Sequence, residues 1–421
     1  MMTVEARKLL ASVSDTAMID VAKDLIRIPS FKTEETEAAY FLAEFFRERG
    51  YITKMQEVEP GRFQTIAILR GTGGGKSLML NGHTDIDPLA MGWSRDPWKP
   101  SIEGNRLYGA GSRNMKGGLA TIIAAAEAIR TSGIKLKGDL VLAFVVGELQ
   151  GGVGTSYLCE YGPLADVAVV PEPFGAHNII TVSAGVVELA VNVLGSSRHI
   201  SRLEEGSVDA IENMSKAIPV LKNLQFRHSP REDLPGMPRA IVGAIVGGRG
   251  RDHNLRGPNF VSDFCTALVD VRFLPGMSAE SVREDIETAL ENLKKTVEDF
   301  HYEIEMPLDP KYKAFTMVME PFDLPRDEYI LKSVLVHYRA VTGREPDGIG
   351  AVPPGSYSGD DTSHLWAAGV PCLLYGPGGS QESETVQDEY TRIDDMSLVA
   401  RVLALTALDV CALPEQEISS P

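Results

Sequence analysis

The sequence predicts an α/β fold with a mostly parallel sheet, helices on both faces, and a smaller α+β domain inserted into it. Three observations support this prediction. Helix-like and strand-like segments alternate over residues 1–183, several strand-like runs end in polar residues, and the pattern changes over residues 184–308. With 421 residues, the chain is also too long for a single core.

The first domain begins with segments in which apolar residues recur at helical spacing. This spacing predicts helices over residues 18–26, 38–49 and 115–130. Short apolar runs predict strands over residues 77–80, 139–146 and 166–170. Strands that alternate with helices in this way are typical of a parallel sheet.

The segment 184–308 has a different order of elements. Alternating or apolar runs predict strands over residues 186–193, 240–246, 264–272 and 302–306, and helical spacing predicts helices over 208–221 and 279–300. This β-α-β-β-α-β order is typical of a small sheet with helices on one face. A helix over 329–341 and a buried strand over 370–375 then return to the first domain, which we expect to resume at 309 and run to 421.

Composition excludes several classes of protein. Acidic residues outnumber basic ones, 58 to 41, so a net charge of −17 argues against a nucleic-acid partner. Apolar runs are strand-sized, and residues 1–20 carry charges among their apolar positions, so we expect neither a membrane partner nor a signal peptide. The cysteines, which are widely spaced, favour reduced thiols in a cytoplasmic protein: Cys159, Cys265, Cys372 and Cys411.

Metal-capable side chains follow the predicted strands of the first domain. His83 and Asp85 follow the first strand, Glu148 the second, and Glu172 the third. One acidic residue at the start of a loop would be unremarkable. Ligands of open α/β sheets bind at the carboxyl ends of the strands, so four such residues in this place predict one shared site.

Residues 82–88, with the sequence Gly-His-Thr-Asp-Ile-Asp-Pro, resemble the first metal motif of the aminoacylase / carboxypeptidase G / succinyl-diaminopimelate desuccinylase family of metal-dependent amidohydrolases. Further matches follow at residues 107–111, 114–118, 151–155, 172–173, 376–378 and 388–390. The resemblance covers nearly the whole chain. It implies a zinc-exopeptidase-like catalytic domain with an inserted lid or dimerisation domain, and a homodimer.

The chain departs from this family at several ligand positions. The resemblance implies two metal ions roughly 3.5 Å apart, bridged by an aspartate. His83 and Glu172 are kept, but the bridging position is Asn114, one acidic ligand is Leu149, and the final histidine is Thr385.

These losses fall on one metal position. His83, Asn114 and Glu172 remain for the other, with Glu148 as general base and Asp85 as the carboxylate that orients the histidine. We therefore predict one divalent ion per chain, Mn²⁺ or Zn²⁺. The amide oxygen of Asn114 favours the harder Mn²⁺.

The resemblance also assigns roles within the inserted domain. It implies that His199 stabilises an oxyanion, and that Asn259 and Arg272 hold a substrate carboxylate. An ordinary strand ion pair is an equal alternative for Arg272. Asp360 and Asp361 lie in a Gly- and Ser-rich loop, which is a weak signal for a pocket.

The predicted function is a mononuclear metal-dependent hydrolase that cleaves a C–N bond of a small carboxylate. One ion suits an electron-poor substrate, and the chain resembles the 5-nitroanthranilate aminohydrolase branch, which deaminates an activated aromatic amine. One alternative is an N-acyl-amino-acid amidohydrolase or dipeptidase that recruits a second metal through Glu382 or Glu384. The other is a non-catalytic, metal-free binding paralogue.

Overall fold

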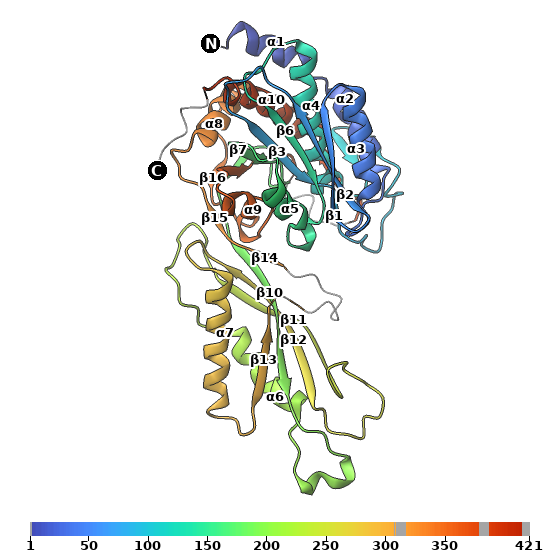
Figure 1. Cartoon of the computed structure of the whole chain (residues 1–421), viewed down its shortest axis with the longest axis vertical. Helices are drawn as coiled ribbons and strands as arrows, with labels where there is room; N and C mark the ends of the chain where they lie inside the picture. Colours follow the sequence, from blue (N-terminus) through green and yellow to red (C-terminus); the bar gives the residue numbers. More distant parts are fainter. Residues whose placement is uncertain (1, 307, 309–316, 379–386, 415–421) are drawn as a thin grey trace. The chain divides into compact units, whose positions relative to one another are not determined.

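The computed structural model describes residues 2–306, 308, 317–378 and 387–414, and it divides into two units (Figure 1). The first unit holds the residues up to Val182, Phe322–Gly355, and those from Asp360 onward. The second holds Ser183–Pro321 and Ser356–Gly359. The return to the first domain therefore comes later than the predicted residue 309, because β14 (Val318–Met319) still pairs with β10 (Gly185–Leu194) of the second unit.

The main sheet of the first unit is parallel at its centre. In sheet order, its strands are β1 (Ile52–Glu59), β2 (Arg62–Leu69), β6 (Leu140–Val145), β3 (Leu78–His83), β7 (Val167–Val170), β17 (Cys372–Leu374), β8 (Asn178–Ile180) and β16 (Gly348–Gly350). Strand β3 lies between β6 and β7 and is parallel to both. The antiparallel pair β1–β2 was not predicted, because charged and amide residues interrupt its apolar positions.

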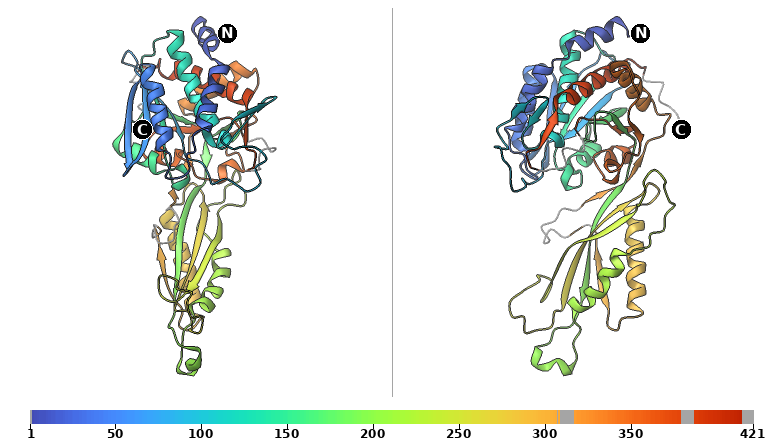
Figure 2. Two further views of the ribbon diagram at one scale, coloured as in Figure 1. Left: turned by 90° about the vertical axis from the view of Figure 1, so that its right-hand side faces the viewer. Right: turned by 180° about the vertical axis from the view of Figure 1, so that it is seen from behind.

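Helices of the first unit pack in two groups beside this sheet (Figures 1 and 2). One group contains α1 (Val4–Ser12), α2 (Asp15–Ile26), α4 (Gly117–Ser132), α8 (Tyr329–Thr342) and α10 (Ile393–Val410), and the other contains α5 (Val153–Tyr161) and α9 (Thr362–Ala367). Helix α3 (Thr36–Glu48) packs on β1 and β2. A separate small sheet has the order β18 (Tyr390–Arg392), β5 (Arg106–Tyr108) and β4 (Ser101–Glu103).

The second unit is an antiparallel sheet with helices packed on it. Its order is β11 (Arg239–Gly248), β12 (Phe264–Phe273), β10 and β13 (His301–Glu305). Helices α6 (Ala210–Lys222) and α7 (Ala279–Lys294) contact this sheet and each other. The predicted β-α-β-β-α-β order is confirmed, but the helix predicted over 279–300 ends at Lys294, because the chain reverses before β13 and Asp299 adopts a φ of 52°.

Among the described residues, no helix combines the length and the apolar character that a membrane span requires. All four cysteines are described, and each is a free thiol.

A buried ion pair ties β2 to the chain around it. Arg62, with 4% of its side chain exposed, donates two hydrogen bonds to the fully buried carboxylate of Glu35. The same guanidinium donates to Glu59 at 2.8 Å and to Gln150 at 2.7 Å. Gln150 lies in the turn after β6, so Arg62 supports the segment that carries Glu148.

Replacing Arg62 with methionine tests this pair. The Arg62→Met variant leaves the carboxylate of Glu35 buried without its partner, which costs about 3–5 kcal/mol of unfolding free energy. Urea denaturation measures this loss, and Arg70→Met is the matched control. Arg70 pairs with Asp139 but is 64% exposed, so its loss costs at most about 1 kcal/mol. Equal losses in the two variants would contradict the assigned role of Arg62.

Candidate functional site

The carboxyl ends of three neighbouring parallel strands bring the predicted site residues together. His83 is the last residue of β3, Glu148 follows β6, and Glu172 follows β7. The Nε2 atom of His83 lies 3.5 Å from Glu172 Oε1 and 3.9 Å from Glu148 Oε2. His83, Glu148 and Glu172 are all buried, so their charges interact with little solvent screening.

Asn114 completes this cluster from a different segment. It lies in the turn Ser112–Lys116 just before α4, where its own backbone is extended rather than helical (φ −115°, ψ 101°), and its Oδ1 atom is 3.1 Å from Nε2 of His83. Oxygens of Asn114, Glu172 and Glu148 therefore all lie within 3.9 Å of Nε2 of His83.

Such a cluster requires a cation or a proton between its atoms. Nδ1 of His83 lies 2.9 Å from the carbonyl oxygen of Asp85, to which it can donate, leaving Nε2 to face the oxygens. Burial lowers the pKa of His83, but Asp85, Glu172 and Glu148 together raise it well above its ordinary value. A proton on Nε2 thus balances the carboxylates, and a divalent ion would replace that proton.

The separations within the cluster fit a metal ion. Ligands about 2.1 Å from a tetrahedral centre lie about 3.4 Å apart, close to the 3.1 Å and 3.5 Å that separate Nε2 of His83 from Asn114 and Glu172. Across the described ranges, no group of three or more His, Cys, Asp and Glu side chains is arranged to hold an ion. The amide oxygen of Asn114, 3.1 Å from Nε2 of His83, is in a position to serve as a third donor beside His83 and Glu172.

Two carboxylates in this region have buried oxygens without hydrogen-bond partners among the described residues: Oε1 of Glu172 and both oxygens of Asp361. Burial is the main cause that raises the pKa of Glu172 to about 7 and that of Asp361 to about 8, against the opposing influence of His83. The hydroxyl of Thr155 is close enough to Asp361 to lower its pKa somewhat, although it forms no hydrogen bond of good geometry. Unpaired buried oxygens of this kind call for an ion or a proton.

Asp361 was only weakly indicated by the sequence. It lies at the start of α9, and a Cβ atom on Gly152 would come within 3.1 Å of its Oδ1 atom. Its carboxylate is therefore packed against the loop that follows Glu148. The only sequence signal was the Gly- and Ser-rich loop in front of it.

Asp85 joins two of the strand ends. Its carboxylate accepts the backbone N–H groups of Glu148 at 3.2 Å and of Leu149 at 3.0 Å, and lies 3.5 Å from Nδ1 of His83. Burial favours its neutral form, but His83 and the Leu149 N–H hold the pKa of Asp85 below its usual range. Asp85 is thus an ionised group that positions both the histidine and the loop of Glu148.

The pKa of Glu148 shifts in the direction opposite to that of Asp85. Burial, followed by the charges of Glu172, Asp361 and Asp85, raises the pKa of Glu148 well above its usual range, and only His83 opposes this. A carboxyl group with a raised pKa holds an accepted proton more firmly than an ordinary carboxyl group does, and it can pass that proton on to a leaving group.

The lost ligand positions are only partly described. Leu149 follows Glu148 in the turn Glu148–Gln150 and has no donor atom in its side chain. Thr385, Glu382 and Glu384 lie outside the described residues, so the second metal position is judged from Leu149 alone.

The predicted residues of the second unit fall into two groups. Asn259 Nδ2 lies 2.8 Å from Nε2 of His199, whose ring also packs edge-on against Phe260. Arg272 instead forms a bidentate ion pair with Asp270, at 2.8 and 2.9 Å, and donates to Ser358 at 3.1 Å. This is the strand ion pair that was the alternative to carboxylate binding for Arg272.

Glu389 is a second residue without a predicted role. The signature at residues 388–390 pointed to this segment but not to its function. Its carboxylate accepts backbone N–H groups of Gly111, Arg113 and Asn114 at 2.8–3.0 Å.

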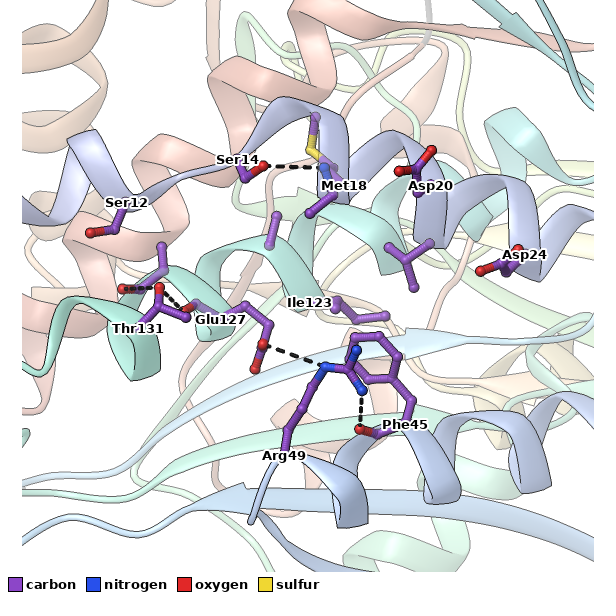
Figure 3. Close-up of a pocket in the computed structure, with 14 residues that line it drawn as sticks. Ser12, Ser14, Met18, Asp20, Asp24, Phe45, Arg49, Ile123, Glu127 and Thr131 are labelled. Carbon is purple, nitrogen blue, oxygen red and sulfur yellow. Dashed lines mark hydrogen bonds and ion pairs between the residues drawn. The ribbon is translucent and has the colours of Figure 1, made fainter.

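Another pocket, between α2, α3 and α4, contains none of the predicted site residues (Figure 3). Its volume is about 330 Å³. The guanidinium of Arg49 donates to the carbonyl of Phe45 at 2.9 Å and pairs with Glu127 at 3.6 Å. Among the described residues, its lining contains no histidine or cysteine, and Arg49, its one cation, is already paired, so we place the chemistry at the strand ends.

The raised carboxyl pKa values predict how metal-free protein responds to pH. Folded protein keeps protons on Glu172 and Asp361 up to about pH 7 and 8, whereas unfolded chain releases them near pH 4. Stabilisation from these protons is complete below pH 4 and is lost as pH rises through 7 and 8. Urea unfolding in chelator should show this decline, with each group adding at most about 1.4 kcal/mol per pH unit.

Matched variants identify the source of this decline. Asp361→Asn should reduce the slope, and saturating Mn²⁺ should remove most of it. Asp20→Asn is the control, because Asp20 is an exposed residue of α2 and does not belong to this cluster. A slope that Asp361→Asn leaves unchanged would exclude that carboxyl as a contributor.

Comparison with known proteins supports the family resemblance. The model of the peptidase family M20/M25/M40 matches residues 79–409. N-formyl-4-amino-5-aminomethyl-2-methylpyrimidine deformylase of Bacillus subtilis (strain 168) is 28% identical over 410 residues, covering 89% of this chain and 92% of that protein. Acetylornithine deacetylase of Proteus mirabilis (strain HI4320) is 30% identical over 321 residues, covering 70% and 79%.

Solved structures share the fold. The Bacillus subtilis YXEP protein, described as a dinuclear metal binding peptidase from the M20 family, superimposes with a TM-score of 0.66 at 15% identity, covering 94% of this chain and 98% of that one. The predicted α/β fold class and the predicted family resemblance are thereby confirmed. The match extends through both units and over most of the chain, which belongs to peptidase family M20/M25/M40.

Proposed function

We propose that the protein is a hydrolase that uses one divalent metal ion to cleave a C–N bond of a small carboxylate. Its best substrate, on this proposal, is an activated aromatic amine such as 5-nitroanthranilate. The observation that carries the proposal is the group formed by His83, Asn114 and Glu172 beside Leu149, which cannot bind a second ion.

The ion would be held by Nε2 of His83, Oδ1 of Asn114 and Oε1 of Glu172. Oxygen donors outnumber nitrogen, which favours Mn²⁺ over a softer ion. When bound, a divalent ion would supply Lewis acidity that lowers the pKa of water. A dication with one carboxylate, one amide and one neutral imidazole leaves a local charge of about +1, which attracts an anionic substrate.

Glu148 is the proposed proton carrier. Its carboxylate takes a proton from the attacking water while oxygen bonds to the ring carbon that bears the amino group. The C–N bond then breaks, and the same proton passes from Glu148 to the leaving nitrogen, which departs as ammonia. A nitro group on the ring accepts the negative charge that builds up, so a second metal ion is not required for that purpose.

Other residues have supporting roles in this proposal. Asp85 keeps His83 and the Glu148 loop in position through the contacts described above. His199 and Asn259, which contact each other, are proposed to act on the substrate as the family resemblance implies. Arg272 could bind a carboxylate only in competition with Asp270.

Hydrolysis of a small N-acyl group is the second candidate. Two relatives support it by name, one a deformylase and the other a deacetylase. A non-catalytic binding protein is less consistent with the retention of Glu148, whose raised pKa suits proton transfer. The homodimer and the cytoplasmic location stay predictions.

Metal content is the primary test. Protein purified without chelator and then equilibrated with Mn²⁺ or Zn²⁺ should contain about one ion per chain, and His83→Ala should lose it. Elemental analysis after desalting gives the ratio. Two ions would overturn the one-metal proposal, and no ion under either condition would favour a binding protein.

Rebuilding the lost ligands gives a complementary measurement. The double variant Leu149→Glu with Thr385→His should lower activity if one ion is sufficient, because an added ligand would disturb the charge of the site. Increased activity together with a second bound ion would show that a two-metal site had been repaired.

A substrate panel separates the two candidate reactions. The loaded enzyme should release ammonia from 5-nitroanthranilate but not from anthranilate, which lacks the nitro group. Glu148→Gln should lower kcat by about 10²–10⁴-fold with metal content unchanged, whereas Glu160→Gln, on the exposed face of α5, should not. Turnover of N-formyl or N-acetyl amines alone would favour the second candidate.

A further inference from the structure

The loop that presents Asn114 is held by a carboxylate from a distant part of the chain. Oε2 of Glu389 accepts the backbone N–H of Gly111 at 2.8 Å. Oε1 accepts those of Arg113 at 2.9 Å and of Asn114 at 3.0 Å. Hydrogen bonds from neutral N–H groups to an ionised carboxylate are among the stronger ones in proteins.

Glu389 is itself firmly anchored. Its carbonyl oxygen accepts the backbone N–H of Gly109 at 3.0 Å, and the next residue, Tyr390, pairs with Tyr108 across β18 and β5. The carboxylate therefore projects from a short sheet rather than from a free loop, and a rigid support allows it to orient its partners.

Asn114 requires such orientation more than an aspartate would. A neutral amide is attracted to a cation less strongly than a carboxylate is, so its oxygen must already face the ion before binding. The position of this oxygen depends on the backbone of Asn114, whose N–H is bound to Glu389. Residues outside the ligand set often contribute to metal affinity in this way.

We propose that Glu389 is a positioning residue for Asn114, holding the amide oxygen toward Nε2 of His83 so that the site binds its ion; this inference rests on the proposed function. Glu389 also supplies, behind the backbone of Asn114, the negative charge that an aspartate at position 114 would carry and that Asn114 lacks. Loss of this carboxylate should weaken metal binding without removing any ligand.

The adjacent residue provides a matched control. The carboxylate of Asp388 accepts hydrogen bonds from the backbone and hydroxyl of Ser94, so it holds a different loop. Asp388→Asn and Glu389→Gln therefore make the same chemical change at neighbouring positions, but only Glu389→Gln weakens the support of Asn114.

The experiment is a Mn²⁺ titration followed by calorimetry and by electron paramagnetic resonance. We expect wild-type protein and Asp388→Asn to bind one ion with affinities within about twofold. We expect Glu389→Gln to bind Mn²⁺ about 10–100-fold more weakly and to give an altered resonance spectrum, while it still unfolds cooperatively in chelator. Glu389→Asp keeps the charge but has a shorter side chain, so its affinity for Mn²⁺ should lie between those of the wild type and of Glu389→Gln.

Several outcomes would overturn the inference. Wild-type affinity in Glu389→Gln would exclude a positioning role, as would equal weakening in the Asp388→Asn control. If Glu389→Gln does not fold, wild-type Mn²⁺ affinity in Glu389→Asp would exclude the positioning role. If wild-type protein binds no ion, the proposed function itself fails and the inference fails with it, so the two failures are distinguishable.

Discussion

The site depends on buried or partly buried carboxylates that accept backbone N–H groups from loops far away in the sequence. Asp85 binds the N–H groups of Glu148 and Leu149, and Glu389 binds that of Asn114. Both carboxylates use their charge to hold the main chain of these loops. The side chains on the loops therefore need no further contacts of their own to stay in position. In this way the side chains of Glu148 and Asn114 are directed to one histidine by carboxylates that bind only the main chain of their loops.

The same principle explains the electrostatic contrast within the cluster. Asp85 has backbone and histidine partners and stays ionised, whereas Glu148, Glu172 and Asp361 have mainly other carboxylates and burial around them, so their pKa values rise. A divalent ion would relieve this repulsion. Binding of such an ion would therefore be linked to proton release and to the stability of this unit.

Sequence reasoning was most successful where backbone geometry alone decides the outcome. His83, Glu148 and Glu172 follow parallel strands, and the carboxyl ends of such strands meet at one edge whatever the side chains do. It failed where contacts are non-local: β1 and β2 were missed, the helix over 279–300 was too long, and Asp361 gave only a weak signal. Glu389 shows the limit clearly, because no local pattern indicates that its carboxylate will bind N–H groups 275–278 residues away.

The position of Glu389, more than 200 residues after Glu172 in the sequence, has a consequence for synthesis. His83, Asn114, Glu148 and Glu172 leave the ribosome early, long before β18 is made. Until residues 388–390 emerge, the turn that carries Asn114 has neither its sheet partner nor its carboxylate. A nascent or truncated chain that lacks these residues would contain the side chains of the cluster without the contacts that hold the turn of Asn114, so the cluster becomes organised only after residues 388–390 are made.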